Sequence, residues 1–117
     1  MPRLLLIVAP LVLTAGVAFA APSATVLKIS ADSKGAMRFD KATLRAKPGK
    51  VTLTMANPSF LPHNVALRGK GVKKLGKVVL KGGTSTVSAT LRAGRYAFYC
   101  SVPGHEKAGM KGVLTVR

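Results

Sequence analysis

The chain after about residue 24 consists of short runs in which apolar and polar residues alternate, separated by turn-forming residues. The clearest run is 51–55, where Val51, Leu53 and Met55 share one parity and threonines occupy the positions between them. Side chains of a β-strand point alternately to its two faces, so this period predicts a strand with one buried face. No long run in this part has the 3.6-residue period of an amphipathic helix. The alternation therefore favours an all-β fold.

We expect seven or eight short strands in one domain that covers residues 21–117. Residues 68–76 are basic and contain glycines, which predicts an exposed connection with room for a short helical turn. Many short strands joined by turns within roughly 97 residues are typical of a Greek-key β-sandwich. The other runs that predict strands or extended segments are 25–31, 37–39, 43–45, 63–67, 77–81, 84–91, 95–100 and 112–117.

Residues 1–20 have the features of a secretory leader. Arg3 precedes an apolar run at 4–13, and Ala18-Phe19-Ala20 supplies the small residues after which signal peptidase cuts. An uncleaved membrane anchor is the alternative, but the run is short for a membrane span and contains Pro10. We therefore expect an exported protein, periplasmic or extracellular, that is cleaved near Ala20.

Cys100 is the only cysteine, so it cannot form a disulfide within the chain. A lone thiol in an exported protein is explained by an intermolecular disulfide, a buried inert thiol or a metal thiolate. His105 and Met110 follow Cys100 closely, which favours the metal thiolate. A thiolate, an imidazole and a thioether together suit copper better than a hard cation. Tyr96 and Phe98 share the parity of Cys100, so the sulfur is expected to point inward at the end of a strand.

A copper ion needs one more ligand than this loop supplies, and His63 is the only other histidine. The pair His63-Asn64, followed by Cys-x4-His-x4-Met, resembles the type 1 (blue) copper proteins of the cupredoxin family, the plastocyanin and azurin group. The resemblance covers residues 25–117 and implies one copper ion as the cofactor. It implies that the trigonal ligands are His63, Cys100 and His105, and that the long axial ligand is Met110.

The same resemblance implies how the two ligand segments are held together. It suggests that Asn64 and Ser101 tie them by hydrogen bonds. It also points to the sandwich fold that the strand pattern predicts. In such a sandwich, His63 and the Cys100 loop can meet at one end although 36 residues separate them.

Three functions are compatible with this set of ligands. The first is a carrier of single electrons, and the second is copper trafficking or sequestration, which would not need reversible redox chemistry. The third is a zinc enzyme with water as the fourth ligand, but it needs a general base, and Glu106 is the only acid beside the loop. The four ligands leave no open position of the kind that catalytic metal sites keep. We therefore expect an electron carrier that is not an enzyme, with copper trafficking as the alternative.

The charge of the chain constrains its partners. Nineteen Lys and Arg face three acidic residues, for a formal net charge of +16, and loss of Arg3 with the leader would leave +15. Such a charge favours an acidic redox protein as partner, and it also fits an anionic membrane or a cell-wall surface. Nucleic acid is not expected, because the basic segment 68–81 has no interleaved aromatic residues for base stacking. We expect a monomer.

Overall fold

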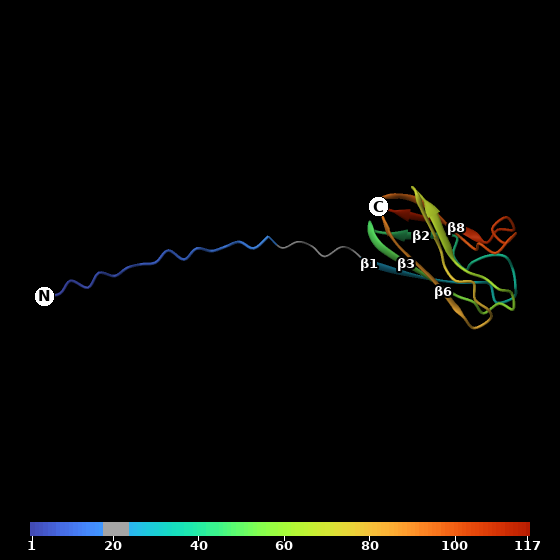
Figure 1. Ribbon diagram of the computed structural model, residues 1–117, viewed down its shortest axis with the longest axis horizontal. Coiled ribbons are helices and arrows are strands. Elements are labelled where there is room, and N and C mark those ends of the chain that lie inside the picture. The colour runs from blue at the N-terminus through green and yellow to red at the C-terminus, as the bar shows by residue number, and fades with distance from the viewer. Residues whose placement is uncertain (18–23) are drawn as a thin grey trace.

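The structure is a computed structural model, and it describes residues 1–17 and 24–117 (Figure 1). The described residues form two β-sheets, which confirms the predicted all-β sandwich. The smaller sheet has the strand order β1-β3-β6, and the larger sheet has the order β2-β8-β7-β4-β5. The strands are β1 (Ala24–Ser30), β2 (Thr43–Ala46), β3 (Gly49–Ala56), β4 (Ala66–Gly69), β5 (Val72–Leu75), β6 (Thr84–Leu91), β7 (Gly94–Tyr99) and β8 (Lys111–Val116).

Most predicted strands are present, but the prediction for residues 68–76 is wrong. This segment is not an irregular connection, because β4 and β5 form a hairpin in which Gly69 pairs with Val72. In β5 only Val72 is partly buried, and the other three residues are exposed. An edge strand that faces solvent on both sides has no alternation of apolar and polar residues, so the sequence pattern could not reveal it.

Two other predicted segments form less strand than expected. Residues 77–81 contribute a single bridge at Val79, and residues 37–39 likewise form one bridge outside the named strands. The other apolar side chains of the first segment, Val78 and Leu80, are exposed. A strand is predicted from apolar residues because they are expected to form a face that packs on the core. Val78 and Leu80 form no such face, so the prediction for this segment was only partly correct.

The core lies between the two sheets and is built from alternate residues of the strands. In β3 the predicted inward residues are buried, with Val51 and Leu53 each 1% exposed and Met55 fully buried. In the larger sheet, Phe98 of β7 is fully buried, and its ring centroid lies 5.6 Å from that of Phe39. The alternation predicted from the sequence thus defines the face on which the sheets meet.

The strand directions give the sandwich two distinct ends. β1 runs parallel to β3, β2 runs parallel to β8, and β6 and β7 run opposite to their neighbours. We call the end where β3 and β7 finish the loop end, and it carries residues 57–65 and 100–110. We call the opposite end the base. The base contains the start of β1 at Ala24, the turns at 47–48, 70–71 and 92–93, and Arg117.

The N-terminal residues lie apart from the sandwich. Residues 1–17 contain neither helix nor strand and extend away from it (Figure 1). None of the described residues forms a helix with the length and apolarity needed to cross a bilayer. The expected cleavage site at Ala18-Phe19-Ala20 lies outside the described residues, so the leader stays a prediction.

Candidate metal centre

Cys100 follows the last residue of β7 and is fully buried. Tyr96, Phe98 and Cys100 are all buried, in agreement with the parity predicted for an inward-pointing sulfur. The backbone N–H of Cys100 donates to the carbonyl oxygen of Met110 over 3.0 Å, and β8 begins at the next residue. The two ends of the loop 100–110 are therefore held side by side by the pairing of β7 with β8.

The loop between these ends is a series of turns. The N–H of His105 donates to the carbonyl of Val102 over 3.0 Å, and the N–H of Met110 donates to the carbonyl of His105 over 3.1 Å. Gly104 and Gly109 have φ values of +82° and +120°, a region in which residues with a Cβ are strained. These turns bring the His105 ring back toward the sulfur of Cys100.

His63 lies at the loop end, in the connection between β3 and β4, and is fully buried. Its backbone is fixed in a bridge with Val79, with N–H to carbonyl distances of 3.1 and 2.8 Å. The preceding turn is held by Asn57, whose side-chain amide donates to the carbonyls of Leu61 and Val79, each over 2.9 Å. The sequence reasoning did not identify this role of Asn57.

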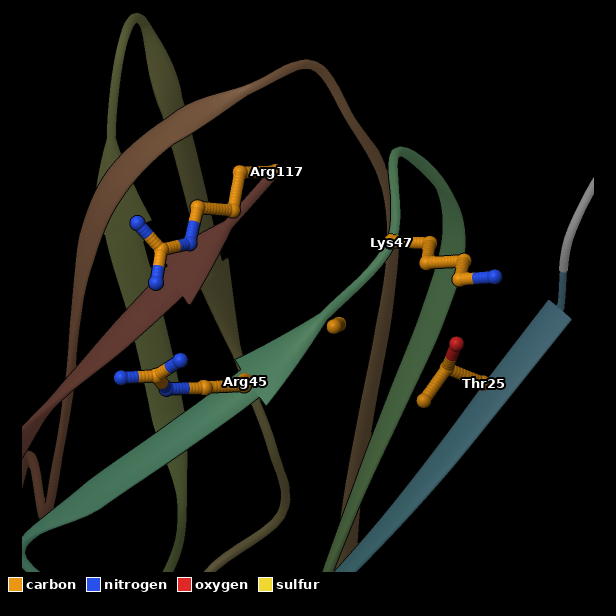
Figure 2. Close-up of a pocket in the computed structure, with 5 residues that line it drawn as sticks. Thr25, Arg45, Lys47 and Arg117 are labelled. Carbon is orange, nitrogen blue, oxygen red and sulfur yellow. The ribbon is translucent and has the colours of Figure 1, made fainter.

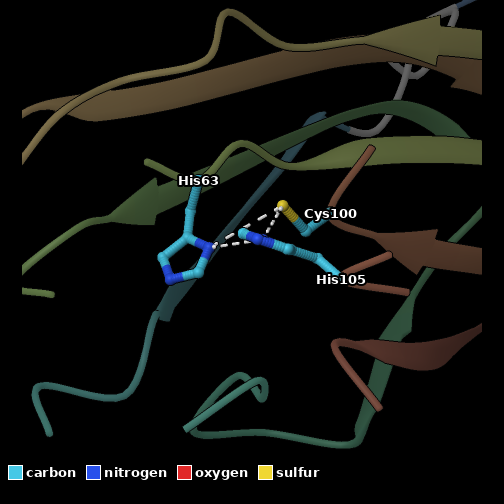
Figure 3. Close-up of side chains that lie close together, drawn as sticks. All are labelled: His63, Cys100 and His105. Atoms are coloured by element: carbon cyan, nitrogen blue, oxygen red, sulfur yellow. Dashed lines mark hydrogen bonds between the residues drawn. The ribbon is translucent and has the colours of Figure 1, made fainter. Parts of the chain in front are cut away.

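Three side chains from these two segments converge on one point (Figure 3). The Nδ1 atoms of His63 and His105 are 3.1 Å apart, and the Sγ of Cys100 lies 3.8 Å from the first and 3.5 Å from the second. A triangle with these sides has a circumradius of about 2.0 Å, and the bonds of a metal such as zinc to imidazole nitrogen and thiolate sulfur are about 2.0–2.3 Å. The three atoms therefore fit a single metal ion.

The surroundings of His63 favour the neutral imidazole that binds metals. Burial lowers the pKa of His63, and the nearby His105 lowers it further. The Nε2 atom of His63 is buried and has no hydrogen-bond partner among the described residues. Because a metal ligand must carry a free lone pair, a histidine held neutral in this way suits the role.

Met110 is placed beside the cluster by its backbone. Its N–H and carbonyl groups bond to His105 and Cys100, and its side chain is fully buried. A buried thioether in the same loop as Cys100 and His105 supplies a further soft donor. The sequence-predicted residues His63, Cys100, His105 and Met110 thus lie together at the loop end.

Asn64 and Ser101 join the two segments that carry these residues. The backbone N–H of Ser101 donates to Oδ1 of Asn64 over 2.7 Å, and Nδ2 of Asn64 donates to Oγ of Ser101 over 2.7 Å. Nδ2 also donates to the carbonyl of Gly76 over 2.9 Å. The backbone N–H of Asn64 points to the sulfur of Cys100 at 3.5 Å. The side chain of Asn64 is therefore a cross-link between the His63 segment and the Cys100 loop.

A second cross-link, which the sequence reasoning missed, holds the outer side of the loop. The guanidinium group of Arg68, on β4, forms a two-point ion pair with the carboxylate of Glu106. The same guanidinium lies 4.2 Å from the centroid of the Tyr99 ring. Its hydrogen bonds lower the pKa of the Glu106 carboxyl. The sequence does show that Glu106 is a rare acid next to His105. It does not show that the partner of Glu106 is Arg68, because the two residues are 38 positions apart.

Comparison with known proteins finds matches over almost the whole sandwich. Residues 25–117 match the family model described as copper binding proteins, plastocyanin/azurin family. A plastocyanin of Scenedesmus fuscus is 32% identical over 99 residues, which are 78% of this chain and 97% of that protein. A chloroplastic plastocyanin of Physcomitrium patens is 32% identical over 105 residues, 83% of this chain and 60% of that protein.

Solved structures have the same fold. The dithionite-reduced auracyanin of Roseiflexus castenholzii is 26% identical and superposes with a TM-score of 0.68, covering 83% of this chain and 99% of that chain. Auracyanin A, a "blue" copper protein of Chloroflexus aurantiacus, gives a TM-score of 0.69 over 81% of this chain and 100% of that chain. At 22% identity, this second likeness supports the fold alone.

Proposed function

Because the chain belongs to the plastocyanin/azurin family of copper-binding proteins, we propose that it carries single electrons between redox partners. The ligands of its copper ion are His63, Cys100, His105 and Met110. The observation that carries this proposal is the convergence of two imidazole nitrogens and one sulfur within 3.8 Å of one another. When bound, copper supplies a one-electron couple between Cu(I) and Cu(II).

The protein's own residues keep the site in one arrangement. His63 is fixed by its bridge to Val79, Cys100 by its pairing with Met110, and both segments by the Asn64 cross-link. A site held by packed strands and buried hydrogen bonds has little freedom to rearrange when its charge changes. Little rearrangement means a low barrier to electron transfer, which suits a carrier better than a protein that must release its metal.

The burial of the ligands suggests how electrons enter and leave. His63 and Cys100 are buried, whereas His105 is partly exposed, so the His105 ring is the ligand nearest to a docked partner. Glu106 is paired with Arg68, so the one acid of the loop is not available as a general base. This arrangement favours electron transfer over catalysis on a bound substrate.

The expected partner is an acidic redox protein that meets this monomer after export. The strong positive charge would steer such a partner toward the protein, and salt would screen the attraction. We therefore expect the rate of electron transfer to an acidic partner to fall as ionic strength rises. Export and removal of residues 1–20 are part of the proposal, and N-terminal sequencing of the secreted protein tests them.

Copper trafficking remains the second candidate, because it would use the same ligands. An electron carrier must be oxidised and reduced reversibly, whereas a trafficking protein need not be. An electron carrier loaded with Cu(II) is expected to have an intense blue absorption that bleaches with a reductant and returns with an oxidant over many cycles. Tight binding of Cu(I), with no colour after addition of Cu(II), would support trafficking and contradict the carrier.

A further inference from the structure

We propose that the base of the sandwich docks on a bilayer that contains anionic phospholipid. The base carries seven exposed cationic side chains, contributed by β2, by the first residues of β3 and β7, by three separate turns and by the residue after β8. They are Arg45, Lys47, Lys50, Lys70, Arg92, Arg95 and Arg117. Segments far apart in the sequence thus place their charges at one end of the molecule.

The charge of the base is not balanced by acidic residues. All three acids of the sequence, Asp32, Asp40 and Glu106, lie at the loop end, and each is paired there with a basic neighbour. Accordingly, none of the seven cations of the base forms a salt bridge in the described residues. Each Lys or Arg held near an anionic leaflet is attracted to it, so a group of unpaired cations on one surface suits a bilayer with anionic lipid.

A shallow hollow of about 420 Å³ lies in the base. It is lined by Thr25, Arg45, Ala46, Lys47 and Arg117, where the start of β1 lies near the ends of β2 and β8 (Figure 2). The guanidinium groups of Arg45 and Arg117 lie on one side of it, and the ammonium group of Lys47 points to the other side (Figure 2). The base therefore spreads its hydrogen-bond donors over a surface, which suits several phosphate headgroups of a bilayer.

The position of the base favours a membrane over a redox partner. β3 connects the base to the loop end with eight residues, which at about 3.3 Å per residue separate the two ends by roughly 25 Å. A partner docked on the base would therefore be held far from His63, Cys100 and His105. A membrane contact at the base would instead leave the loop end facing away from the bilayer.

The test uses the exported protein and two kinds of vesicle, phosphatidylcholine alone and phosphatidylcholine mixed with phosphatidylglycerol. The test variant carries Arg45→Gln, Lys47→Gln and Arg117→Gln. The matched control carries Lys34→Gln, Lys77→Gln and Lys81→Gln, which remove the same charge from exposed positions outside the base. Sedimentation with vesicles measures the affinity, and circular dichroism checks that both variants are folded.

We expect the protein to bind the anionic vesicles, and we expect added salt to release it. The base variant should bind roughly 100-fold more weakly, since each basic residue near an anionic surface contributes about a factor of five. The control variant should lose far less. Equal losses in the two variants, or equal binding to neutral vesicles, would overturn the proposal. The metal-free protein should bind equally well, so the result does not depend on the redox function.

Discussion

Asn64→Ala removes the cross-link between the two segments that carry the copper ligands. The substitution deletes three hydrogen bonds, from Nδ2 to Gly76 and Ser101 and from the Ser101 N–H to Oδ1. Asn64 is only 1% exposed, and Gly76 is buried, so water cannot easily replace the lost partners. The backbone N–H that points to the Cys100 sulfur is retained, because it does not depend on the side chain.

The expected loss of stability follows from this count. A buried hydrogen bond contributes about 1 kcal/mol net, and a buried group left without a partner costs a further 1–3 kcal/mol or so. For three bonds and one buried carbonyl we expect the free energy of unfolding to fall by roughly 4 kcal/mol. In a domain of this size such a loss lowers the Tm by roughly 16 °C or more.

The measurement is urea and thermal unfolding of the metal-free protein, because bound copper would add stability of its own. Ser88→Ala is the matched control, since it deletes one hydrogen bond, between the hydroxyl groups of Ser88 and Thr52, at an exposed position. The control should change the free energy of unfolding by about 0.5 kcal/mol or less. A loss below about 1 kcal/mol in Asn64→Ala would refute the idea that this side chain ties the segments together.

Three further predictions concern the ion pairs and the charge. Arg68→Gln and Glu106→Gln should each lower the free energy of unfolding by about 1 kcal/mol or less, because the pair is partly exposed, and a double-mutant cycle measures the coupling. The pKa of Asp32 is held below its ordinary value of 3.8, mainly by a hydrogen bond from the backbone N–H of Ala36. The stabilising effect of the Asp32 carboxylate is therefore complete above that value and is lost as the pH falls through the lower folded pKa. Over this pH range the free energy of unfolding should fall more steeply in the unsubstituted protein than in the Asp32→Asn variant, as measured by urea unfolding at a series of pH values. Stopped-flow measurements with an acidic redox protein should give a rate that falls steadily with added salt, and a rate independent of salt would contradict electrostatic steering.

The sequence predicted those parts of the fold that depend on local periodicity. In β3, and in β7 as far as Phe98, buried residues alternate with more exposed ones, so the inward residues of both strands followed from parity. The turns after Cys100 were predictable for a similar reason, since Gly104 and Gly109 mark positions that require positive φ. The ligand set was implied by the resemblance of His63-Asn64 and Cys-x4-His-x4-Met to type 1 copper proteins, and a single cysteine and two histidines left few other choices for the trigonal ligands.

The features that escaped prediction depend on contacts between distant residues. β5 is an edge strand of mostly exposed residues, so nothing in its own pattern distinguishes it from a loop. Tyr99 has the outward parity of β7 yet is only 5% exposed, because Arg68 lies over its ring. The pairing of Arg68 with Glu106 and the unpaired charge of the base likewise depend on the folded topology. Single-sequence reasoning has no access to such long-range pairs.

The absorption spectrum of the Cu(II)-loaded protein, compared with that of Cys100→Ser, tests the central claim most directly. Serine is close to cysteine in size, but its oxygen cannot form the copper–thiolate bond that gives a type 1 site its intense colour. Cys100 is fully buried and 3.5 Å from the His105 ring, so the account predicts a strong blue band in the native protein and its complete loss in the variant. A band of equal intensity in both proteins would contradict the assignment of Cys100 as a copper ligand.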